Sequence, residues 1–248
     1  MEYGLLCTAG TVQSYTSIVC HIKKIKFYKQ PVLNKHKYHI TLAHKTIMAT
    51  VHLFTSAHNT TPHFDWSSEY TSCNELSMDN ESPVYAILQF DRSVYIPSHT
   101  LLIGSKLDVD IESKSCRLAF VCDMIDSYND RNQHQLSIVK LKQKSGVIDR
   151  VENEHTVIVR ELFDKNVDCS IFIDYHVSYV VDDRIYTGRI ESTFGKSGKV
   201  RCVFNDALPC SKSEDNKGKI IFTLKDKTII LKYKKYVDAK GDKRFAPL

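Results

Sequence analysis

Apolar and polar residues alternate along much of the chain with a period of two, which is the pattern of half-buried β-strands rather than of helices. Residues 16–28 show it well, because Ile18, Cys20 and Ile22 fall on one face and lysines fall on the other. Ile25 and Phe27 are expected to continue the inward face. Pro31 ends this stretch. The same alternation predicts further strands in the first part of the chain, at residues 38–42, 47–54, 84–90, 101–105, 117–121 and 138–142.

The second part of the chain continues with short apolar runs at close intervals. They predict strands at residues 156–159, 169–173, 177–181, 186–191, 199–204, 219–224 and 228–236. The last two are expected to pair as a hairpin over residues 225–227. Helical periodicity is scarce throughout. The predicted fold class is therefore all-β, with two consecutive small β-barrels.

Two stretches interrupt the strand pattern. Charge concentrates at residues 145–154, which predicts a boundary between a first domain at 1–148 and a second at 153–248. Residues 55–82 have no period and are rich in Ser, Thr, Asn and acidic residues, so they are predicted to be a long surface insertion in the first domain. Trp66 within this stretch either packs on the barrel or lies exposed in the loop.

The composition agrees with a sheet-rich protein, since the 248 residues include 13 Tyr and 11 Phe together with many Val, Ile and Thr. No apolar run approaches the roughly 18 residues that a membrane-spanning helix needs, and the first ten residues do not form a secretion signal. The eight cysteines form no CxxC pair, which argues against a zinc site and a dense disulfide framework. A reduced protein of the cytoplasm is expected, with the nucleus as a second compartment.

The net charge is +5, and its distribution is more informative than its size. Residues 1–50 hold seven lysines and one acidic residue, whereas residues 51–130 hold four basic and twelve acidic residues. Residues 211–248 hold eleven basic and five acidic residues. A basic region near each end suits a polyanionic partner held at two places, and a solvated surface without a partner is the alternative.

The triplet Gly195-Lys196-Ser197 spells the end of a phosphate-binding P-loop, but the spacing does not fit. A P-loop needs another glycine five residues before Gly195, and Ile190 stands there. A helix should follow the motif, whereas residues 199–204 alternate as a strand. The triplet is therefore interpreted as part of a hairpin turn and not as a nucleotide site.

No other catalytic or metal-binding pattern emerges from the sequence. A nucleophilic cysteine would need a local motif, and none surrounds the cysteines here. Two pairs of neighbouring acids fall in predicted turns, Asp108 with Asp110 and Asp182 with Asp183. Carboxylates on exposed turns are solvated, so their pKa values are not separated for acid–base work. The chain is expected to have no catalytic residues and no metal site.

Basic residues on the predicted strands and turns are more informative. Lys35 and Lys37 precede one strand and His44 lies in the turn after it, which would bring them near one end of a hairpin. In the last long strand Lys232 and Lys234 share a face by the two-residue repeat, with two tyrosines interleaved. Such lysines suit contact with an RNA backbone, and the tyrosines would either stack on bases or pack in the core.

Several stretches occur in the order found in one family of translation factors. They are residues 4–12, 35–54, 85–120, 155–165, 188–204 and 233–245. The first resembles the junction before the third domain of translational GTPases. The next two are similar to the third domain of selenocysteine-specific elongation factors. The last three resemble the fourth domain of that family, whose strand–turn–strand carries an FG-x-SGK motif and whose closing strand is basic.

The resemblance implies the C-terminal half of such a factor, of the eukaryotic type: a Greek-key barrel like the family's domain III, followed by a second, basic barrel. The complete factors begin with a GTPase domain and a second barrel, and they bind GTP and Mg. No DxxG or NKxD motif in the required context accompanies the missing P-loop here, so GTP hydrolysis is not carried over. No cofactor is expected in this chain, and it is expected not to be an enzyme.

The resemblance also implies partners and a function. These are selenocysteinyl-tRNA, the selenocysteine-insertion (SECIS) RNA or the protein that binds it, and the ribosome, in the recoding of UGA. A protein-docking scaffold without direct RNA contact is the alternative. The candidate RNA contacts, assigned from charge and position, are Lys35, Lys37, His44 and Arg117 in the first barrel and Lys196, Lys199, Arg201, Lys232, Lys234, Lys235, Lys243 and Arg244 in the second.

Overall fold

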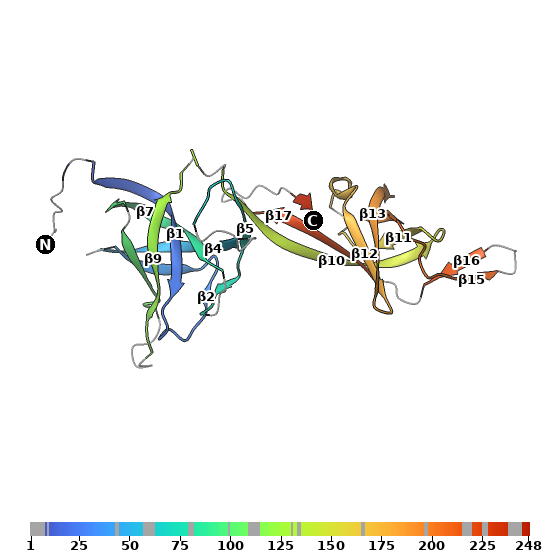
Figure 1. The fold of residues 1–248 in the computed structure, drawn as a ribbon, viewed down its shortest axis with the longest axis horizontal. Coiled ribbons are helices and arrows are strands. Elements are labelled where there is room, and N and C mark those ends of the chain that lie inside the picture. The colour runs from blue at the N-terminus through green and yellow to red at the C-terminus, as the bar shows by residue number, and fades with distance from the viewer. Residues whose placement is uncertain are drawn as a thin grey trace. The chain divides into compact units, whose positions relative to one another are not determined.

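The computed structural model describes residues 8, 10–42, 45–56, 63–78, 82–98, 100–108, 115–129, 131–132, 135–164, 167–195, 198–214, 220–224, 228–237 and 245–248. Its strands are β1 (Val12–Lys24), β2 (Val32–Leu33), β3 (Lys37–Leu42), β4 (Lys45–Ser56), β5 (Glu69–Ser72), β6 (Glu75–Leu76), β7 (Val84–Pro97), β8 (Leu101–Ser105), β9 (Leu118–Ser127), β10 (Ser137–Val151), β11 (Thr156–Arg160), β12 (His176–Val181), β13 (Arg184–Phe194), β14 (Lys199–Phe204), β15 (Ser211–Glu214), β16 (Ile220–Thr223), β17 (Thr228–Tyr236) and β18 (Phe245–Pro247). A short 3₁₀ helix, η2, spans Cys169–Phe172. The all-β prediction is confirmed (Figure 1).

The strands form two compact units, each with its own hydrophobic core. Unit 1 comprises Met1–Val139 with Val237–Asp242, and unit 2 comprises Lys140–Tyr236 with Lys243–Leu248. The change between the units lies inside β10, whereas the charge pattern places it at residues 148–153. The charged residues there, such as Asp149 and Glu152, make ion pairs with β14, and this accounts for the local concentration of charge.

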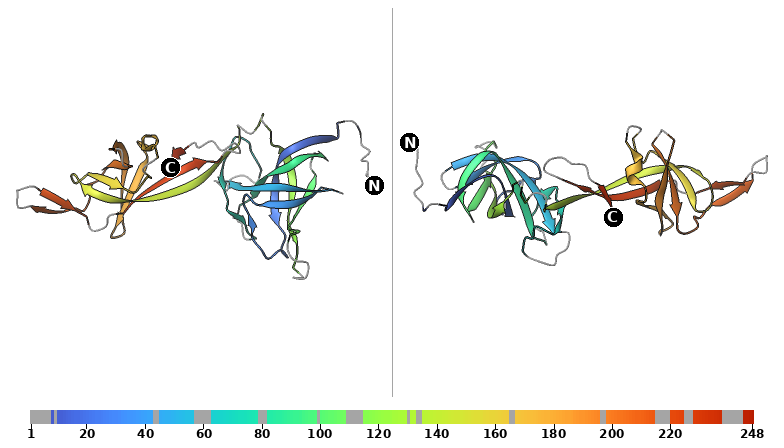
Figure 2. Two further views of the ribbon diagram at one scale, coloured as in Figure 1. Left: turned by 180° about the vertical axis from the view of Figure 1, so that it is seen from behind. Right: turned by 90° about the horizontal axis from the view of Figure 1, so that it is seen from above.

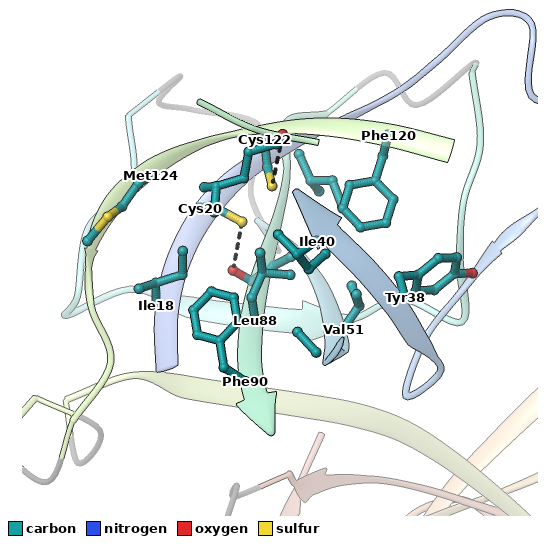
Figure 3. Packing of buried hydrophobic residues seen from close by; sticks show 14 of the residues in the cluster. Ile18, Cys20, Tyr38, Ile40, Val51, Leu88, Phe90, Phe120, Cys122 and Met124 are labelled. Carbon is teal, nitrogen blue, oxygen red and sulfur yellow. Dashed lines mark hydrogen bonds between the residues drawn. The ribbon is translucent and has the colours of Figure 1, made fainter. Parts of the chain in front are cut away.

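Unit 1 contains a closed barrel built from β1, β7, β4, β3, β8 and β9. Each strand pairs antiparallel with the next, and β9 returns to β1. The strands of this unit curve around one interior in the views of Figure 2. Figure 3 shows the interior, where Cys20, Ile40, Leu88 and Phe120 point toward one another and are fully buried. Burial raises the pKa of the Cys20 thiol well above its usual value, so this thiol stays protonated and unreactive.

A second layer covers the outside of this barrel, and part of the predicted surface insertion forms it. Strand β5 pairs with β4 and, in parallel, with the start of β10. It carries Tyr70, which is 2% exposed and lies 5.2 Å from the Phe54 ring and 5.7 Å from the Tyr85 ring. The prediction of a surface insertion without strands is therefore wrong for residues 69–76, which contain β5 and β6 and bury Tyr70 and Leu76. Aromatic side chains without a regular period pack there, so alternation could not find these strands.

Trp66 belongs to the same outer layer. Its ring lies 5.1 Å from Phe64 and stacks at 6.5 Å on Tyr128, and it packs against the buried cluster of Phe54, Tyr70 and their neighbours. Of the two alternatives left open by the sequence, packing on the barrel is the observed one. Trp66 is also the only tryptophan of the chain, so its fluorescence reports on unit 1 alone.

Unit 2 closes in the same manner, in the order β10, β11, β14, β13, β12, β17 and back to β10, with β18 added beside β17. Val157, Tyr179, Ile190, Cys202 and Leu231 form the centre of its core, and all are fully buried. In β12, β14 and β17 the alternation of the sequence places these residues inward, and the residues between them are half-buried or exposed. In β11 both faces are covered, because Ile158 is fully buried as well.

Two sequence expectations fail in unit 2. Residues 169–173 form the 3₁₀ turn η2 instead of a strand, because the Asp168 carboxylate accepts hydrogen bonds from the backbone N–H and the hydroxyl of Ser170 at 3.0 and 2.6 Å. Strand β16 pairs with β15 and not with β17, which is paired instead with β12 and β18. The predicted hairpin over residues 225–227 is therefore wrong.

Cysteines and membrane segments can be assessed over the described residues. None of their cysteines forms a disulfide, and Cys20, Cys122, Cys169 and Cys202 are buried. No helix in that part of the chain has the length and hydropathy to cross a membrane. No three potential ligands among His, Cys, Asp and Glu come together there as a metal site.

Candidate nucleic-acid interface

The structure describes eight of the twelve candidate RNA contacts. They are Lys35, Lys37, Arg117, Lys199, Arg201, Lys232, Lys234 and Lys235. His44, Lys196, Lys243 and Arg244 lie outside the described residues. The turn that carries Gly195 joins β13 to β14, with Phe194 paired to Lys199, so the strand that was predicted to follow the GKS triplet is present.

The strand ends of unit 1 gather basic residues at one end of the barrel. In the register, His39 of β3 pairs with Ser105 of β8, and Ser105 pairs with Leu118 of β9. Lys24 of β1 pairs with Phe120 of β9, so the end of β1 reaches the same place. We call the exposed lysines on and after these strand ends the basic end of unit 1; they are Lys23, Lys26, Lys29 and Lys35.

The basic end carries little compensating charge. Residues 3–64 contain no Asp or Glu at all. Within the described part of the chain, none of the four ammonium groups lies within 4.0 Å of a carboxylate. An acid-free run of this length is the sequence signal that would have found Lys26 and Lys29, which were not among the predicted contacts.

An exposed aromatic ring stands among these lysines. Strand β1 ends at Lys24, so Phe27 lies in the turn beyond it and 75% of it is exposed. The alternation extrapolated through residue 28 placed Phe27 inward, and that expectation is wrong. A phenyl ring between Lys26 and Lys29 is the arrangement that stacks on a nucleobase while the ammonium groups meet phosphates.

A groove of about 540 Å³ opens at the same end of unit 1. Tyr28, Tyr38, His36 and His39 are among the residues that line it, and the Lys106 ammonium lies 5.6 Å from the centre of the Tyr38 ring. The Nδ1 atom of His39 is buried without a hydrogen-bond partner. Asp108 also lines the groove, and its carboxylate pairs with the Lys106 ammonium at 3.0 Å. The aromatic rings and imidazoles are thus the groups of the groove that are suited to a nucleobase.

Two residues of unit 1 that were predicted to contact RNA, Lys37 and Arg117, instead make hydrogen bonds within the protein. Lys37 donates hydrogen bonds to both carboxylate oxygens of Asp91, at 2.9 and 3.0 Å. The Arg117 guanidinium donates to the Leu107 carbonyl, and the Arg117 carbonyl accepts from the Lys106 N–H at 2.9 Å. Arg117 therefore bonds to the two residues that follow the end of β8 by one and two positions, Lys106 and Leu107 being its partners.

Lys37 starts β3, and Lys35 lies two residues before it. Leu42 at the other end of β3 pairs with Lys45 of β4. The expectation that Lys35 and Lys37 lie near His44 at one end of a hairpin falls on a residue outside the described ones and stays a prediction.

In unit 2, Lys199 and Arg201 of β14 belong to a surface network of ion pairs. Lys199 lies 2.8 Å from Asp149, and Arg201 lies 3.0 Å from Glu152 and 3.4 Å from Glu191. A hydrogen bond from the Lys199 ammonium lowers the pKa of the Asp149 carboxyl. Phosphate groups would have to displace these carboxylates, so the two cations are weak candidates for an RNA contact.

The basic strand β17 distributes its side chains over two faces. Leu231 and Tyr233 point into the core, where the Tyr233 ring lies 5.3 Å from Phe172. Tyr233 therefore packs and is not available to stack on a base. Lys232 is exposed and alternates onto the outer face with Lys234, whereas Lys235 alternates onto the side of Tyr233.

Two family models match consecutive parts of the chain. The third domain of eukaryotic selenocysteine-specific elongation factors matches residues 19–122, and the C-terminal RIFT domain of eEFSec matches residues 134–240. The curated selenocysteine-specific elongation factor of Mus musculus is 28% identical over 263 residues, which cover 92% of this chain and 44% of the mouse protein. The chain thus spans less than half the length of this relative.

Solved structures show the same fold. The apo form of translation elongation factor SelB from Methanococcus maripaludis superposes with a TM-score of 0.60 at 17% identity, covering 93% of this chain and 44% of the archaeal one. The complex of that factor with the GTP analogue GppNHp gives 0.58 at the same identity, covering 92% and 43%. The likeness extends over both units, and at this identity it establishes their architecture.

Proposed function

Because the chain belongs to the eukaryotic selenocysteine-specific elongation factors and carries counterparts of their third and C-terminal domains, we propose that it helps to bind selenocysteinyl-tRNA and to bring it to the ribosome for UGA recoding. The observation that carries this proposal is the order of the two family matches along one chain. The work assigned to the chain is binding and positioning in the cytoplasm, without bond-making by its own residues and without a cofactor of its own.

We assign the tRNA contact to the basic end of unit 1. Lys23, Lys26, Lys29 and Lys35 are exposed and uncompensated within the described chain, and Phe27 stands among them. Ammonium groups on a rigid barrel bind RNA phosphates and release counterions, which supplies affinity that depends on salt. We assign to unit 2 the recruitment role, toward the SECIS RNA or the protein that binds it, because its β14 cations are already paired with acids.

The first prediction concerns charge. The triple variant Lys26→Ala/Lys29→Ala/Lys35→Asn should weaken binding to selenocysteine tRNA by about tenfold or more and reduce the slope of log affinity against log salt by about three. Asparagine is chosen at position 35 because Lys35 has a φ of +63°, which asparagine tolerates. Filter binding or fluorescence anisotropy at several salt concentrations measures both quantities.

Lys45→Ala is the matched control, since Lys45 is exposed in unit 1 but lies at the other end of β3. It should leave affinity and slope unchanged, and bulk tRNA should bind more weakly than selenocysteine tRNA. If the triple variant binds as the parent does, the basic end is not the RNA site. Binding of a protein partner that survives nuclease treatment, together with no tRNA affinity, would favour the docking scaffold instead.

The second prediction separates stacking from charge. Phe27→Ala should weaken tRNA binding by about tenfold, since a stacked base contributes about 1–3 kcal/mol. The salt slope should not change, because no counterion is released at a phenyl ring. Phe27 is 75% exposed, so its replacement should leave the melting temperature unaltered. A loss of affinity that comes with a lower salt slope would contradict the stacking role.

A further inference from the structure

The outer face of β13, β12 and β17 in unit 2 brings together an apolar pair and two cations, Arg189 and Lys232. In the β12–β13 hairpin, Val180 pairs with Ile185 and His176 pairs with Arg189. Ser178 lies between them and pairs with Thr187 on one side and Ile230 of β17 on the other. These residues alternate with the core residues of their strands, so they share the outward side.

The apolar pair, Val180 and Ile185, is exposed to solvent although the two side chains lie directly opposite each other. Ile185 is 67% exposed and Val180 is 41% exposed. The hairpin closes through Asp182 and Asp183, whose φ angles of +46° and +62° belong to a tight two-residue turn. Both exposed side chains are β-branched and stiff, so burying them against a partner costs little rotamer entropy.

The two cations flank His176, which lies four residues along β12 from Val180 of the apolar pair. Arg189 and His176 are exposed neighbours across β13 and β12, and continuing the β12–β17 register brings Lys232 to the other side of His176. Arg189 makes a 3.6 Å ion pair with Asp174, and both side chains remain more than half exposed, so this pair is weak. Arg189 and Lys232 therefore favour a partner with carboxylates.

The composition of the face favours a protein over RNA. Sites for single-stranded RNA use exposed aromatic rings for stacking. Here the tyrosines of the two hairpin strands, Tyr179 and Tyr186, point to the core side, and the exposed apolar side chains are aliphatic. Aliphatic groups beside cations suit the apolar centre and charged rim of a protein interface.

We propose that this face of unit 2 docks a protein segment that presents aliphatic side chains beside Asp or Glu, the aliphatic groups on Val180 and Ile185 and the carboxylates on Arg189 and Lys232. This deepens, and rests on, the recruitment role proposed above for unit 2. It does not depend on whether unit 1 binds tRNA. Lys232, a predicted RNA contact, is thereby assigned to a protein partner.

The test is a selection of random 16-residue peptides displayed on phage against the purified chain. The enriched peptides should combine aliphatic residues with Asp or Glu. Synthetic copies should bind the double variant Val180→Thr/Ile185→Thr about tenfold or more weakly, and the double variant Arg189→Glu/Lys232→Glu about tenfold more weakly. Threonine keeps the β-branched shape, so melting of the first variant should match the parent.

Leu101→Thr is the matched control, because Leu101 is 55% exposed but belongs to unit 1. It should bind the peptides as the parent does. Failure to enrich acidic aliphatic peptides, or peptide binding that the threonine variant does not reduce, would overturn the proposal. So would a loss of tRNA binding, or of self-association in sedimentation, caused by the threonine variant alone. The lysine variants of unit 1 test the tRNA role separately.

Discussion

Replacing Gly188 by alanine is expected to destabilise unit 2 by about 3 kcal/mol or more. Gly188 lies on β13 between Val177 of β12 and Phe204 of β14, on the core side of the sheet. A Cβ atom there would stand 2.4 Å from the Val203 carbonyl oxygen and 3.0 Å from the Phe204 Cα. Both atoms belong to the backbone of the paired strand, so the two strands must separate for alanine to fit.

Circular dichroism should show a transition of unit 2 lowered by about 10 °C or more, while Trp66 fluorescence should report an unchanged unit 1. Thr187→Ala is the control, because Thr187 is the neighbouring exposed residue on the same strand. Adding Phe204→Leu should not restore stability, since the clash with the carbonyl group remains. An unaltered unit 2 would mean that β13 and β14 are more widely spaced at this point than the structure has them.

Replacing Gly104 by alanine is expected to destabilise unit 1 by about 3 kcal/mol. Gly104 pairs with Phe120 across β8 and β9, and the Phe120 ring packs over it. An added Cβ would fall between 2.1 and 2.4 Å from three atoms of that ring. The ring is fully buried and cannot move aside without disturbing the barrel interior around Ile40 and Leu88.

Here the obstacle is a side chain, so a second change should relieve it. The double variant Gly104→Ala/Phe120→Leu should recover part of the stability, and a double-mutant cycle should show a coupling of about 1 kcal/mol or more. Trp66 fluorescence measures the transition of unit 1 directly. Additive effects of the two substitutions would contradict this account of the packing. Each glycine variant destabilises one unit, so tRNA binding measured above the lowered melting temperature of that unit shows which unit the binding requires.

Where alternation is clean and ends in turn residues, the sequence predicts the fold closely. Strands β8 and β14 have the predicted bounds, 101–105 and 199–204. Residues 169–173 show the limit of this argument, because Cys169, Ile171 and Ile173 also alternate. A local hydrogen bond from Ser170 to Asp168 outweighs the pattern and makes a turn. Periodicity also does not tell which strands pair with each other. For this reason the pairing of β16 with β15 was not predicted.

The sequence predicted which type of residue would contact RNA, but not which individual lysines are available for it. Lysines were expected to contact RNA, yet their availability depends on acids far away in sequence: Lys37 meets Asp91, and Lys199 meets Asp149. Ion pairs between residues so far apart in the sequence cannot be predicted from a local sequence pattern. Phe27 was misplaced for a related reason, since only the pairing of β1 with β9 shows that the strand stops at Lys24.

The aromatic layer over the barrel of unit 1 restricts the directions from which a bulky ligand can approach. Val19, Phe54, Tyr85 and Ile87, on the outer side of β1, β4 and β7, are all buried beneath it. A nucleic-acid stem cannot touch these four side chains, although other residues of the same strands, such as Lys23, remain exposed. The outer surface of these strands, which is exposed in an isolated barrel, is thus covered here. A bulky ligand can still approach unit 1 at the residues where β1 ends and β3 begins.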